Sequence, residues 1–491
     1  MSFTGELPPQ RLNLARYCLA GKPAAKTALI VAGQVTGRWT YGALEDVVLR
    51  LGEGLRRAGL ERHERLFIRM GNSLDYALVF LAATAIGAVP IPASPMLVER
   101  EVAGLLAHSG ARFLAWDRAL ALPDVTGIKV VNPADLQRMR QCPAGTYADT
   151  EADDPAYLVY TSGTSGTPKG VLHGHRAIWG RRPMYQGWYG IGADDVMLHT
   201  GAFNWTYTLG TGLCDPFANG ATAIVTTGER DPHVWERLAR DHGATILASV
   251  PGIYRQFLRT GFKPGPTLRH ALTAGEALPL ALLDHWRAET GLELYEALGM
   301  SEISTYISSS PTVPVRRGSP GKAQPGRSIR IFESGEIGVH RSDPGLLLRY
   351  WGEDIPGGEW FPTGDLAQID ADGYVWYEGR ADDMMNAGGF RVSPLEVEAV
   401  LLQHPDVADA GVREWRVSET NSIIAAFIVP CGSRAPEEHH IFSFMRERLA
   451  AYKVPKQIWF VDALPRTANG KLVRKALDRN QGSSDDGSFC H

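Results

Sequence analysis

The chain has 491 residues, of which 44% are hydrophobic and 21% are charged, with a formal net charge of -4. This length exceeds one ordinary domain and predicts roughly two to four units. The small net charge gives no reason to expect a nucleic-acid partner. The five cysteines are odd in number and far apart, and no CxxC or Cys/His cluster occurs. They predict neither a disulfide framework nor a zinc site, and they favour a reducing, cytoplasmic location.

The first half of the chain alternates helical and strand patterns. Residues 1–14 lack the charged start and apolar core of a secretion signal. The most apolar run, residues 76–89, is too short for a membrane span and is interrupted at Gly87, so it predicts a buried helix followed by a short strand. Further patterns continue in α/β order: strands over 156–160, 222–226 and 244–249, and a helix over 231–242.

A stretch rich in glycine and hydroxyl side chains, YTSGTSGTPKG, begins in the strand predicted over 156–160. Glycines let main-chain N–H groups approach a ligand closely, and successive N–H groups form a nest for anions. Lys169 adds a point charge that suits phosphate. The spacing differs from a Walker A loop, because Lys169 follows Pro168 and precedes Gly170. The stretch therefore predicts a phosphate-binding loop, with a flexible surface loop as the alternative.

Two short motifs further along predict turns. TAGEALP, residues 273–279, taken alone predicts a tight turn before a helix. DADGY, residues 370–374, lacks the third acid and the distal Glu of a calcium loop. It predicts a hairpin turn instead.

The composition changes after Arg380. Beyond it, Ser393 is a suitable helix N-cap, with Pro394 in the first turn and Glu396 completing a capping box. A strand pattern and an amphipathic helix pattern follow, over 422–430 and 437–452. We therefore predict three parts of the chain: an N-terminal domain over 1–381, a small α+β C-terminal domain over 382–479 and a disordered tail over 480–491.

Several motifs in a fixed order carry a family resemblance: YTSGTSGTPKG (160–170), ALGMSE (297–302), TGD (363–365), GRADDMMNAGGFRVSP (379–394) and PRTANGK (465–471). Together they resemble the adenylate-forming superfamily, which includes acyl-CoA synthetases, stand-alone carrier-loading adenylation enzymes and firefly-type luciferases. The resemblance covers nearly the whole chain. It implies an α/β fold with a large layered α/β N-terminal domain and a small mobile α+β C-terminal domain. It also implies ATP, Mg²⁺ and coenzyme A as cofactors.

The resemblance assigns the ATP phosphates and the metal to two motifs. The glycine-rich loop would hold the β- and γ-phosphates through hydroxyl, main-chain and ammonium donors: Thr161, Ser162, Gly163, Thr164, Ser165, Thr167 and Lys169. Glu302 would bind Mg²⁺ together with Thr161, and Ser301 would face the α-phosphate. Without this context, a Ser-Glu pair is more typical of a helix start.

The adenosine part of ATP would contact three further segments. The loop near the base would contain Gly275, Glu276 and Ala277. Leu298 offers an aliphatic face to the base where the family usually has a Tyr ring. Asp365 and Arg380 would both contact the ribose hydroxyls. A carboxylate such as that of Asp365 accepts ribose hydroxyl protons in dinucleotide sites too. Taken alone, this pair could equally form a surface ion pair.

The C-terminal motifs would act in two successive steps. Lys471 would bridge the substrate carboxylate and the α-phosphate, where two anions must approach each other. Outside the PRTANGK motif it would be interpreted as a solvated surface residue. Asp382 would be the hinge of the mobile domain, and Gly388 and Gly389 would leave room beside the pantetheine arm. The family often has Lys at the position of Asn386, so this chain departs from the pattern there.

The implied reaction is the ligation of a small carboxylic acid to coenzyme A through an acyl-adenylate. We expect no membrane span in the chain. The segment over 199–212 favours the acyl- or aryl-CoA ligase branch, with a medium-chain or aryl acid as substrate. Trp205 is a candidate aromatic gate of the acyl pocket, or else a core residue. Gly299 would leave the pocket floor open. The alternatives are loading of a carrier-protein phosphopantetheine and a non-catalytic nucleotide-binding sensor.

Overall fold

The computed structural model describes residues 2–161, 169–353, 355, 357–387, 390–417, 422–432, 436–467 and 471–478. Two compact units divide the chain. The N-terminal unit comprises Met1–Leu278, Leu282–Arg330 and Val339–Phe361, and the C-terminal unit comprises Pro279–Ala281, Ile331–Gly338 and Pro362–His491. A large α/β part with a separate smaller part is thus confirmed. The boundary at 381/382 stays a prediction, and the tail over 480–491 lies outside the described residues.

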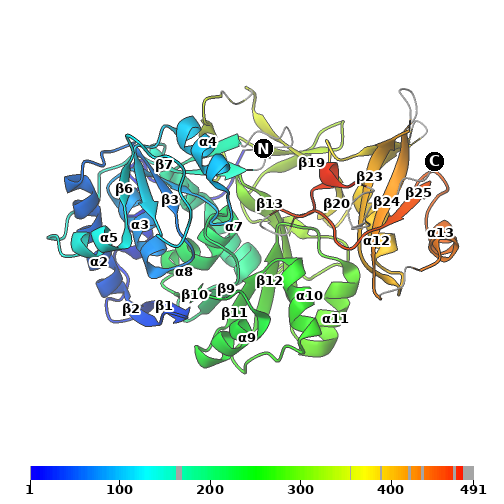
Figure 1. Ribbon diagram of the computed structural model, residues 1–491, viewed down its shortest axis with the longest axis horizontal. Coiled ribbons are helices and arrows are strands. Elements are labelled where there is room, and N and C mark those ends of the chain that lie inside the picture. Colours follow the sequence, from blue (N-terminus) through cyan, green and yellow to red (C-terminus); the bar gives the residue numbers. More distant parts are fainter. Residues whose placement is uncertain are drawn as a thin grey trace, which may run out of the picture. The chain divides into compact units, whose positions relative to one another are not determined.

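The main sheet of the N-terminal unit runs in the order β15-β14-β13-β12-β11-β9-β10-β1-β2 (Figure 1). Its strands are β1 Thr27–Gly33, β2 Gly37–Thr40, β9 Val196–His199, β10 Thr222–Thr227, β11 Ile246–Ser249, β12 His270–Ala274, β13 Leu294–Met300, β14 Ser304–Ser308 and β15 Gly321–Ala323. The central strands pair in parallel and are buried, which explains their continuous apolar sequences. The strands predicted over 222–226 and 244–249 are confirmed as β10 and β11.

Both faces of this sheet are covered. On one face pack three helices through a cluster that includes Trp235, Tyr254 and Trp286: α9 Pro232–Asp241, α10 Pro251–Arg259 and α11 Leu280–Thr290. The predicted helix over 231–242 is confirmed as α9, and Asp231 caps it by accepting the N–H groups of residues 233 and 234. The other face carries an aromatic cluster from η3 Tyr185–Tyr189 and α7 Thr206–Leu209.

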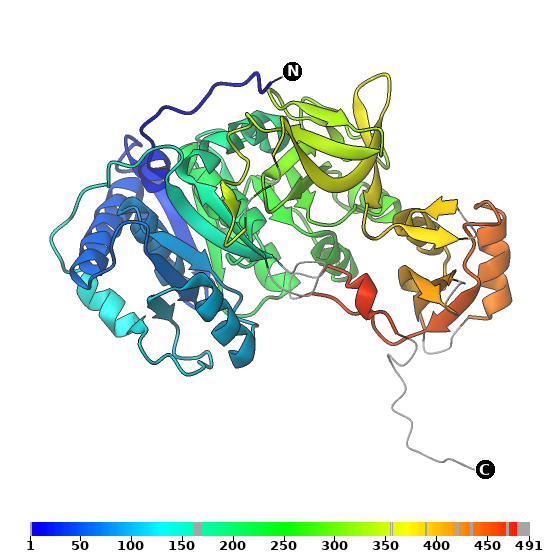
Figure 2. The ribbon, with the colours of Figure 1, turned by 90° about the horizontal axis from the view of Figure 1, so that it is seen from above.

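A second, all-parallel sheet has the order β4-β3-β5-β6 and lies among the blue and cyan helices in Figure 2. Its elements are β3 Arg65–Arg69, β4 Val89–Pro92, β5 Phe113–Trp116, β6 Lys129–Val131, α2 Tyr41–Arg57, α3 Leu74–Ala85, α4 Glu99–Ser109 and α5 Pro133–Met139. The apolar run over 76–89 is confirmed as the buried α3 followed by β4. Within the part of the chain that the structure describes, no helix is long and apolar enough to cross a membrane.

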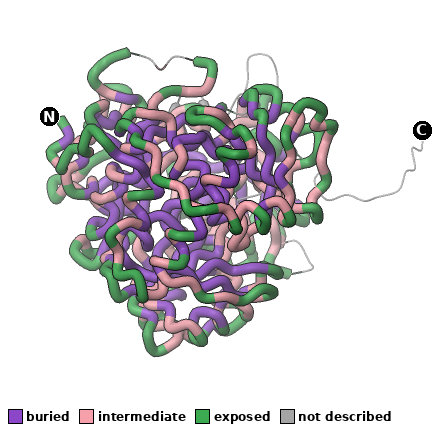
Figure 3. The backbone as a smooth tube through the Cα atoms, turned by 90° about the vertical axis from the view of Figure 1, so that its left-hand side faces the viewer, coloured by how far each residue is buried: buried purple, intermediate pink, exposed green. Residues whose placement is uncertain are grey.

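The smaller N-terminal elements surround these sheets. A three-stranded sheet has the order β18-β8-β7. The remaining elements are β7 Pro155–Thr161, β8 Lys169–Gly174, β18 Arg349–Tyr350, α1 Leu14–Leu19, η1 His175–Ala177, η2 Trp179–Arg181, α6 Arg182–Met184, η4 Gly210–Cys214 and α8 Asp215–Ala218. Buried residues, purple in Figure 3, gather in the interior, and exposed residues, green, lie mostly along the outer turns of the tube.

The C-terminal unit contains a long hairpin and a small α+β part. Two short strands, β16 Ile329–Ile331 and β17 Glu336–His340, lie only partly within this unit. Its other elements are β19 Trp360–Ile369, β20 Tyr374–Arg380, β21 Met385–Ala387, β22 Phe390–Val392, α12 Pro394–Leu401, β23 Val407–Arg416, β24 Ser422–Pro430, α13 Glu438–Arg446, β25 Gln457–Phe460 and η5 Arg474–Ala476. The DADGY segment forms the predicted turn between β19 and β20, where Gly373 has φ +84° and Asp370 Oδ1 accepts the Tyr374 N–H at 2.9 Å.

Helix α12 begins where the sequence predicts, but the predicted capping box is wrong. The Ser393 hydroxyl donates to the carbonyl oxygen of Glu378 rather than accepting from its own helix. Glu396 instead pairs with Lys453, whose Nζ lies 2.6 Å from Oε1. Contacts with distant segments therefore replace the local cap. The helix predicted over 437–452 covers only Glu438–Arg446.

Candidate active site

The carboxylate expected to bind a metal, Glu302, lies in a tight turn between two antiparallel strands. β13 ends at Met300 and β14 begins at Ser304, so the Ser-Glu pair does not start a helix. The Leu347 N–H donates to the Glu302 carbonyl oxygen at 2.7 Å, and the Tyr350 hydroxyl donates to Glu302 Oε1 at 2.9 Å. These bonds hold both the main chain and the carboxylate of Glu302.

Tyr350 also connects Glu302 to Lys169. The Lys169 ammonium lies 5.1 Å from the centroid of the Tyr350 ring and 3.8 Å from Glu353 Oε2. Tyr350 reaches this position because β18 pairs with β8, directly opposite Val171. A cation over a tyrosine face is attracted by the ring. The structure thus brings the predicted phosphate-binding lysine and the predicted metal ligand to one aromatic side chain.

A buried histidine holds the main chain next to Glu302. His173 Nε2 lies 2.8 Å from the carbonyl oxygen of Ser301, so this nitrogen carries the proton and donates. The His173 ring stacks on Tyr157 at 4.7 Å. Burial lowers the pKa of His173 to about 4, which keeps the ring neutral at ordinary pH.

The predicted phosphate loop begins and ends at paired residues. Thr161 in β7 and Lys169 in β8 are partners across an antiparallel pair. The predicted residues between them lie outside the described residues: Ser162, Gly163, Thr164, Ser165 and Thr167. Gly388 and Gly389, predicted beside the pantetheine arm, lie outside them as well.

The donor set fits a magnesium ion. Glu302 supplies carboxylate oxygens and Thr161 a hydroxyl oxygen, and hard oxygen donors are the ones Mg²⁺ prefers. Both side chains are partly accessible to solvent, so an ion can reach them. Nearby phosphate oxygens would complete such a site, as is usual for Mg²⁺ with nucleotides.

Trp205 lies against the loop that was predicted to pass near the base. Gly275 has φ +95°, and a Cβ there would lie only 2.9 Å from Trp205 Cζ2, so only glycine allows this close approach. Trp205 is half-buried and meets the edge of the Tyr207 ring at 5.4 Å. Tyr207 in turn stacks on Trp188 at 5.6 Å. The candidate gate and residues 275–277 are therefore neighbours.

The same loop is attached to β13 by a carboxylate. The Leu278 N–H donates to Glu296 Oε1 at 2.8 Å. Burial raises the pKa of Glu296 to about 7, although this hydrogen bond opposes the rise. Glu296 precedes Leu298, the residue predicted to face the base, by two positions in the same strand. It therefore fixes the loop over 275–278 relative to the ALGMSE motif.

The open pocket floor expected at Gly299 is not seen. A Cβ at this position would overlap the carbonyl oxygen of Ser304 and lie 2.6 Å from Thr305 Cα. The strand pair is irregular here, with a register shift between Leu298 and Gly299. Glycine is required because the main chain of β14 passes so close. The space is filled by backbone, and a role of Gly299 in the acyl pocket stays a prediction.

The two residues expected at the ribose are partners across the hairpin of the C-terminal unit. Asp365 and Arg380 face each other in β19 and β20, with Arg380 Nη1 3.4 Å from Asp365 Oδ1. Asp365 is buried, and its Oδ1 also accepts the Tyr377 hydroxyl at 3.2 Å. Arg380 donates to the Thr363 carbonyl oxygen at 2.8 Å and lies 3.4 Å from Asp382. Asp365 and Arg380 thus form an ion pair that further hydrogen bonds hold in place, and Asp365 is not on the surface.

Lys471 belongs to the same unit. Its side chain is exposed, and its main chain exchanges two hydrogen bonds with Thr467, at 2.8 and 3.2 Å. The following turn is anchored by Arg474, which lies 2.6 Å from Glu398 and 3.2 Å from Asp383. The catalytic role of Lys471 and the hinge role of Asp382 stay predictions.

Sequence reasoning missed Tyr350, His173 and Glu296. Tyr350 is 48 positions from Glu302, and His173 is 128 positions from Ser301, so no local pattern could connect them. Glu296 offered a signal, because an acid within the otherwise apolar β13 is costly unless it has a partner.

Comparison with known proteins agrees with these features. Residues 17–348 match the model of the family described as AMP-binding enzyme, and residues 396–471 match the AMP-binding enzyme C-terminal domain. The chain is 31% identical to benzoate–CoA ligase of Thauera aromatica over 96% of each chain. A benzoate CoA ligase structure from Burkholderia xenovorans LB400 matches at 29% identity with a TM-score of 0.84, covering 94% of this chain and 99% of that one. The structure of an anthranilate CoA ligase with anthranoyl-AMP matches at 26% identity and TM-score 0.86, covering 95% and 97%.

Proposed function

The chain belongs to the AMP-binding enzyme family and is an ATP-dependent acid–CoA ligase, and we propose that its acid is an aryl carboxylic acid. The observation that carries this proposal is the half-buried Trp205 ring, which lies against Gly275 and is backed by the buried rings of Tyr207 and Trp188. Flat aromatic side chains offset-stack on, or meet edge-on, an aryl ring. The two relatives named for benzoate and the one named for anthranilate support the same class.

The reaction has two steps, formation of an acyl-adenylate and its conversion to a thioester. A carboxylate oxygen of the acid attacks the α-phosphorus of ATP, the bond from this phosphorus to the bridging oxygen breaks, and pyrophosphate leaves. The thiol sulfur of coenzyme A then attacks the acyl carbonyl carbon, the bond to the AMP oxygen breaks, and the thiol proton passes to solvent. No base is needed to ionise the acid, because carboxylates are already charged at neutral pH.

The N-terminal unit supplies the charge-compensating groups of the first step. Glu302 and Thr161 would hold Mg²⁺, which supplies positive charge next to the phosphates. Lys169 would bind the phosphates, and Tyr350 orients the Glu302 carboxylate. Neutral His173 fixes the Ser301 main chain without adding charge.

The C-terminal unit would supply the ribose contacts and the second cation. Asp365 would accept the ribose hydroxyls, with Arg380 beside it. We expect Lys471 to approach the reacting carboxylate and α-phosphate, where negative charge accumulates. We further propose that this domain moves about Asp382 between the two steps. A cytoplasmic location, favoured by the cysteine pattern, stays a prediction.

A panel of acids with ATP, Mg²⁺ and free coenzyme A tests the proposal. We expect AMP and an acyl-CoA to form together, with kcat/KM for benzoate, hydroxybenzoates or anthranilate exceeding that for acetate by roughly ten-fold or more, given the apolar area of a ring. Trp205→Ala should reduce this preference. A higher kcat/KM for octanoate than for every aryl acid would refute the aryl proposal. AMP formation only with a phosphopantetheinylated carrier protein would refute coenzyme A as the acceptor.

A further inference from the structure

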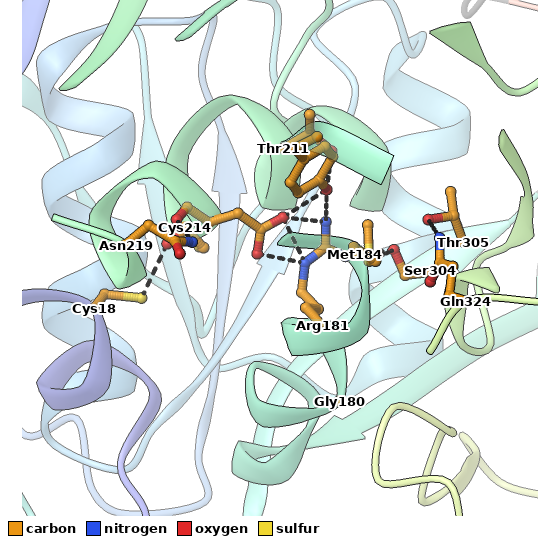
Figure 4. A network of polar contacts seen from close by, with 12 residues as sticks. Cys18, Gly180, Arg181, Met184, Thr211, Cys214, Asn219, Ser304, Thr305 and Gln324 are labelled. Carbon is orange, nitrogen blue, oxygen red and sulfur yellow. Dashed lines mark hydrogen bonds and ion pairs between the residues drawn. The ribbon is translucent and has the colours of Figure 1, made fainter. Parts of the chain in front are cut away.

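A buried ion pair lies beneath the turn that carries Glu302. Arg181, at the end of η2, meets Asp215, at the start of α8, with Nε 2.8 Å from Oδ1 and Nη2 2.7 Å from Oδ2 (Figure 4). Their side chains are 6% and 0% exposed. The Tyr189 hydroxyl donates to Asp215 Oδ2 at 2.8 Å and lies 2.8 Å from Thr211 Oγ1. Both oxygens of the Asp215 carboxylate thereby accept hydrogen bonds.

The remaining guanidinium nitrogen of Arg181, Nη1, contacts the end of the turn that carries Glu302. Arg181 Nη1 donates to the hydroxyl of Ser304. That hydroxyl lies 3.7 Å from Met184 Sδ, so it can accept from Arg181 and donate to sulfur (Figure 4). A side chain at residue 210 would collide with the guanidinium, and Gly210 gives it the required room. The fold thus leaves room for the guanidinium as a whole.

Ser304 has an unfavourable backbone conformation. Its φ is +73°, and His63 is the other non-glycine residue with positive φ in the part of the chain that the structure describes. Such a conformation persists only where surrounding contacts impose it, and it often marks a functional site. Ser304 closes the turn after Glu302, and its carbonyl lies against Gly299. The strain therefore lies two residues beyond Glu302, at a residue whose carbonyl contacts Gly299 of the ALGMSE segment.

We propose that Arg181 is a positioning residue for the ATP-activation step: held by Asp215, it fixes Ser304 and so places Ser301 and Glu302. This inference rests on the proposed function, because it takes Glu302 as the metal ligand. A buried ion pair adds little net stability compared with an apolar pair. The hydrogen bond from Arg181 to Ser304, the strained residue two positions after Glu302, instead indicates a positioning role for this ion pair.

Substitutions at Ser304 separate the tether from the ion pair. Ser304→Ala removes the acceptor and leaves Arg181 and Asp215 paired. Ser304→Gly also removes the acceptor, but it relieves the strain of positive φ. Tyr189→Phe is the matched control, because it removes the hydroxyl that donates to Asp215 and accepts from Arg181 Nη2 at 3.2 Å, while the Arg181 Nη1 bond to Ser304 stays in place.

The primary readout is equilibrium binding of Mn²⁺·ATP, followed by electron paramagnetic resonance without acid or coenzyme A. We expect Ser304→Ala to weaken this binding roughly ten-fold, in line with losing a hydrogen bond to a charged donor. Ser304→Gly should retain a several-fold defect, and Tyr189→Phe should bind like the wild type. In all variants, conversion of supplied acyl-adenylate and coenzyme A to thioester should be unchanged.

Two results would overturn the inference. Binding by Ser304→Gly equal to the wild type would mean that only the backbone angle matters and that the tether to Arg181 does not. Equal losses in Ser304→Ala and Tyr189→Phe would reduce the network to a general structural role. A wild type that binds Mn²⁺·ATP but adenylates no acid would instead refute the proposed function.

Discussion

Arg474→Met tests how the turn after Lys471 is anchored. Arg474 and Glu398 are 14% and 8% exposed, with a closest distance of 2.6 Å between Nη2 and Oε2. The substitution preserves the apolar stem and leaves the Glu398 carboxylate without its main partner. Breaking a buried pair in this way costs about 3–5 kcal/mol. We expect the lower end of that range, about 3 kcal/mol, because Arg474 retains some access to water.

The loss should depend on pH in a defined direction. Burial raises the pKa of Glu398 above its ordinary 4.5, while Arg474 opposes that rise. Without Arg474 the pKa of Glu398 in the folded chain rises further. As the pH falls, Glu398 therefore takes up its proton at a higher pH in the folded chain than in the unfolded chain. A raised folded-state pKa gives stability at low pH that is lost as the pH rises through it. The deficit of Arg474→Met should therefore be greatest at neutral pH and shrink as the pH falls toward 4.5.

The double variant Glu398→Gln/Arg474→Met provides the control. It removes the buried charge, and the glutamine oxygen can still accept the Val412 N–H that Glu398 Oε1 accepts at 2.9 Å. Stability can be measured by urea denaturation, with hydrogen exchange of β23 peptides as the local probe. If the single and double variants unfold alike, or if the deficit of the single variant does not change with pH, the electrostatic reasoning is wrong.

Four further outcomes are expected. Lys471→Ala should abolish acyl-adenylate formation but still convert supplied acyl-adenylate and coenzyme A to thioester; an equal loss in both half-reactions would contradict its role. Asp382→Pro fixes φ at the proposed hinge and should impair one half-reaction far more than the other, whereas normal turnover would place the hinge elsewhere. Gly299→Ala should lower the melting temperature and the activity on all acids alike, because its Cβ meets the β14 backbone; a selective gain for acetate at unchanged stability would restore the open-floor interpretation. Burial lowers the pKa of several N-terminal histidines to about 4, and to about 3 for His199: His173, His175, His199 and His270. Their folded-state pKa lies below the ordinary 6.5, so the free energy of unfolding should fall as the pH drops from 6.5 toward 4, and a flat urea-denaturation profile would contradict this.

The sequence predicted the elements whose signals are local. Helix α9 was predicted from the helical pattern over 231–242, and the turn at 370–374 from its Asp and Gly residues. The apolar strands β10 and β11 were predicted from short apolar runs in α/β order, and their burial in a parallel sheet explains why these runs do not alternate. The order of motifs predicted which residues belong to one site, and the structure places Lys169 and Glu302 at one tyrosine.

The incorrect or missing predictions involve long-range contacts. Ser393 was expected to cap its own helix, but a carbonyl oxygen in β20 is a better-placed acceptor for its hydroxyl. The role of Gly299 in the acyl pocket stays a prediction, and what its sequence context did not indicate is the close approach of the β14 backbone. Tyr350 and Arg181 were not identified, because their importance depends on strand pairing and helix packing that no local pattern encodes.

The most direct measurement follows one oxygen atom from the acid to AMP. Benzoate with both carboxylate oxygens replaced by a heavy isotope is incubated with the enzyme, Mg²⁺, ATP and coenzyme A, and the AMP is weighed by mass spectrometry. Attack of the carboxylate on the α-phosphorus must transfer one labelled oxygen into AMP while the acyl-CoA keeps the other. Unlabelled AMP, or label found in phosphate alongside ADP, would contradict activation through an acyl-adenylate.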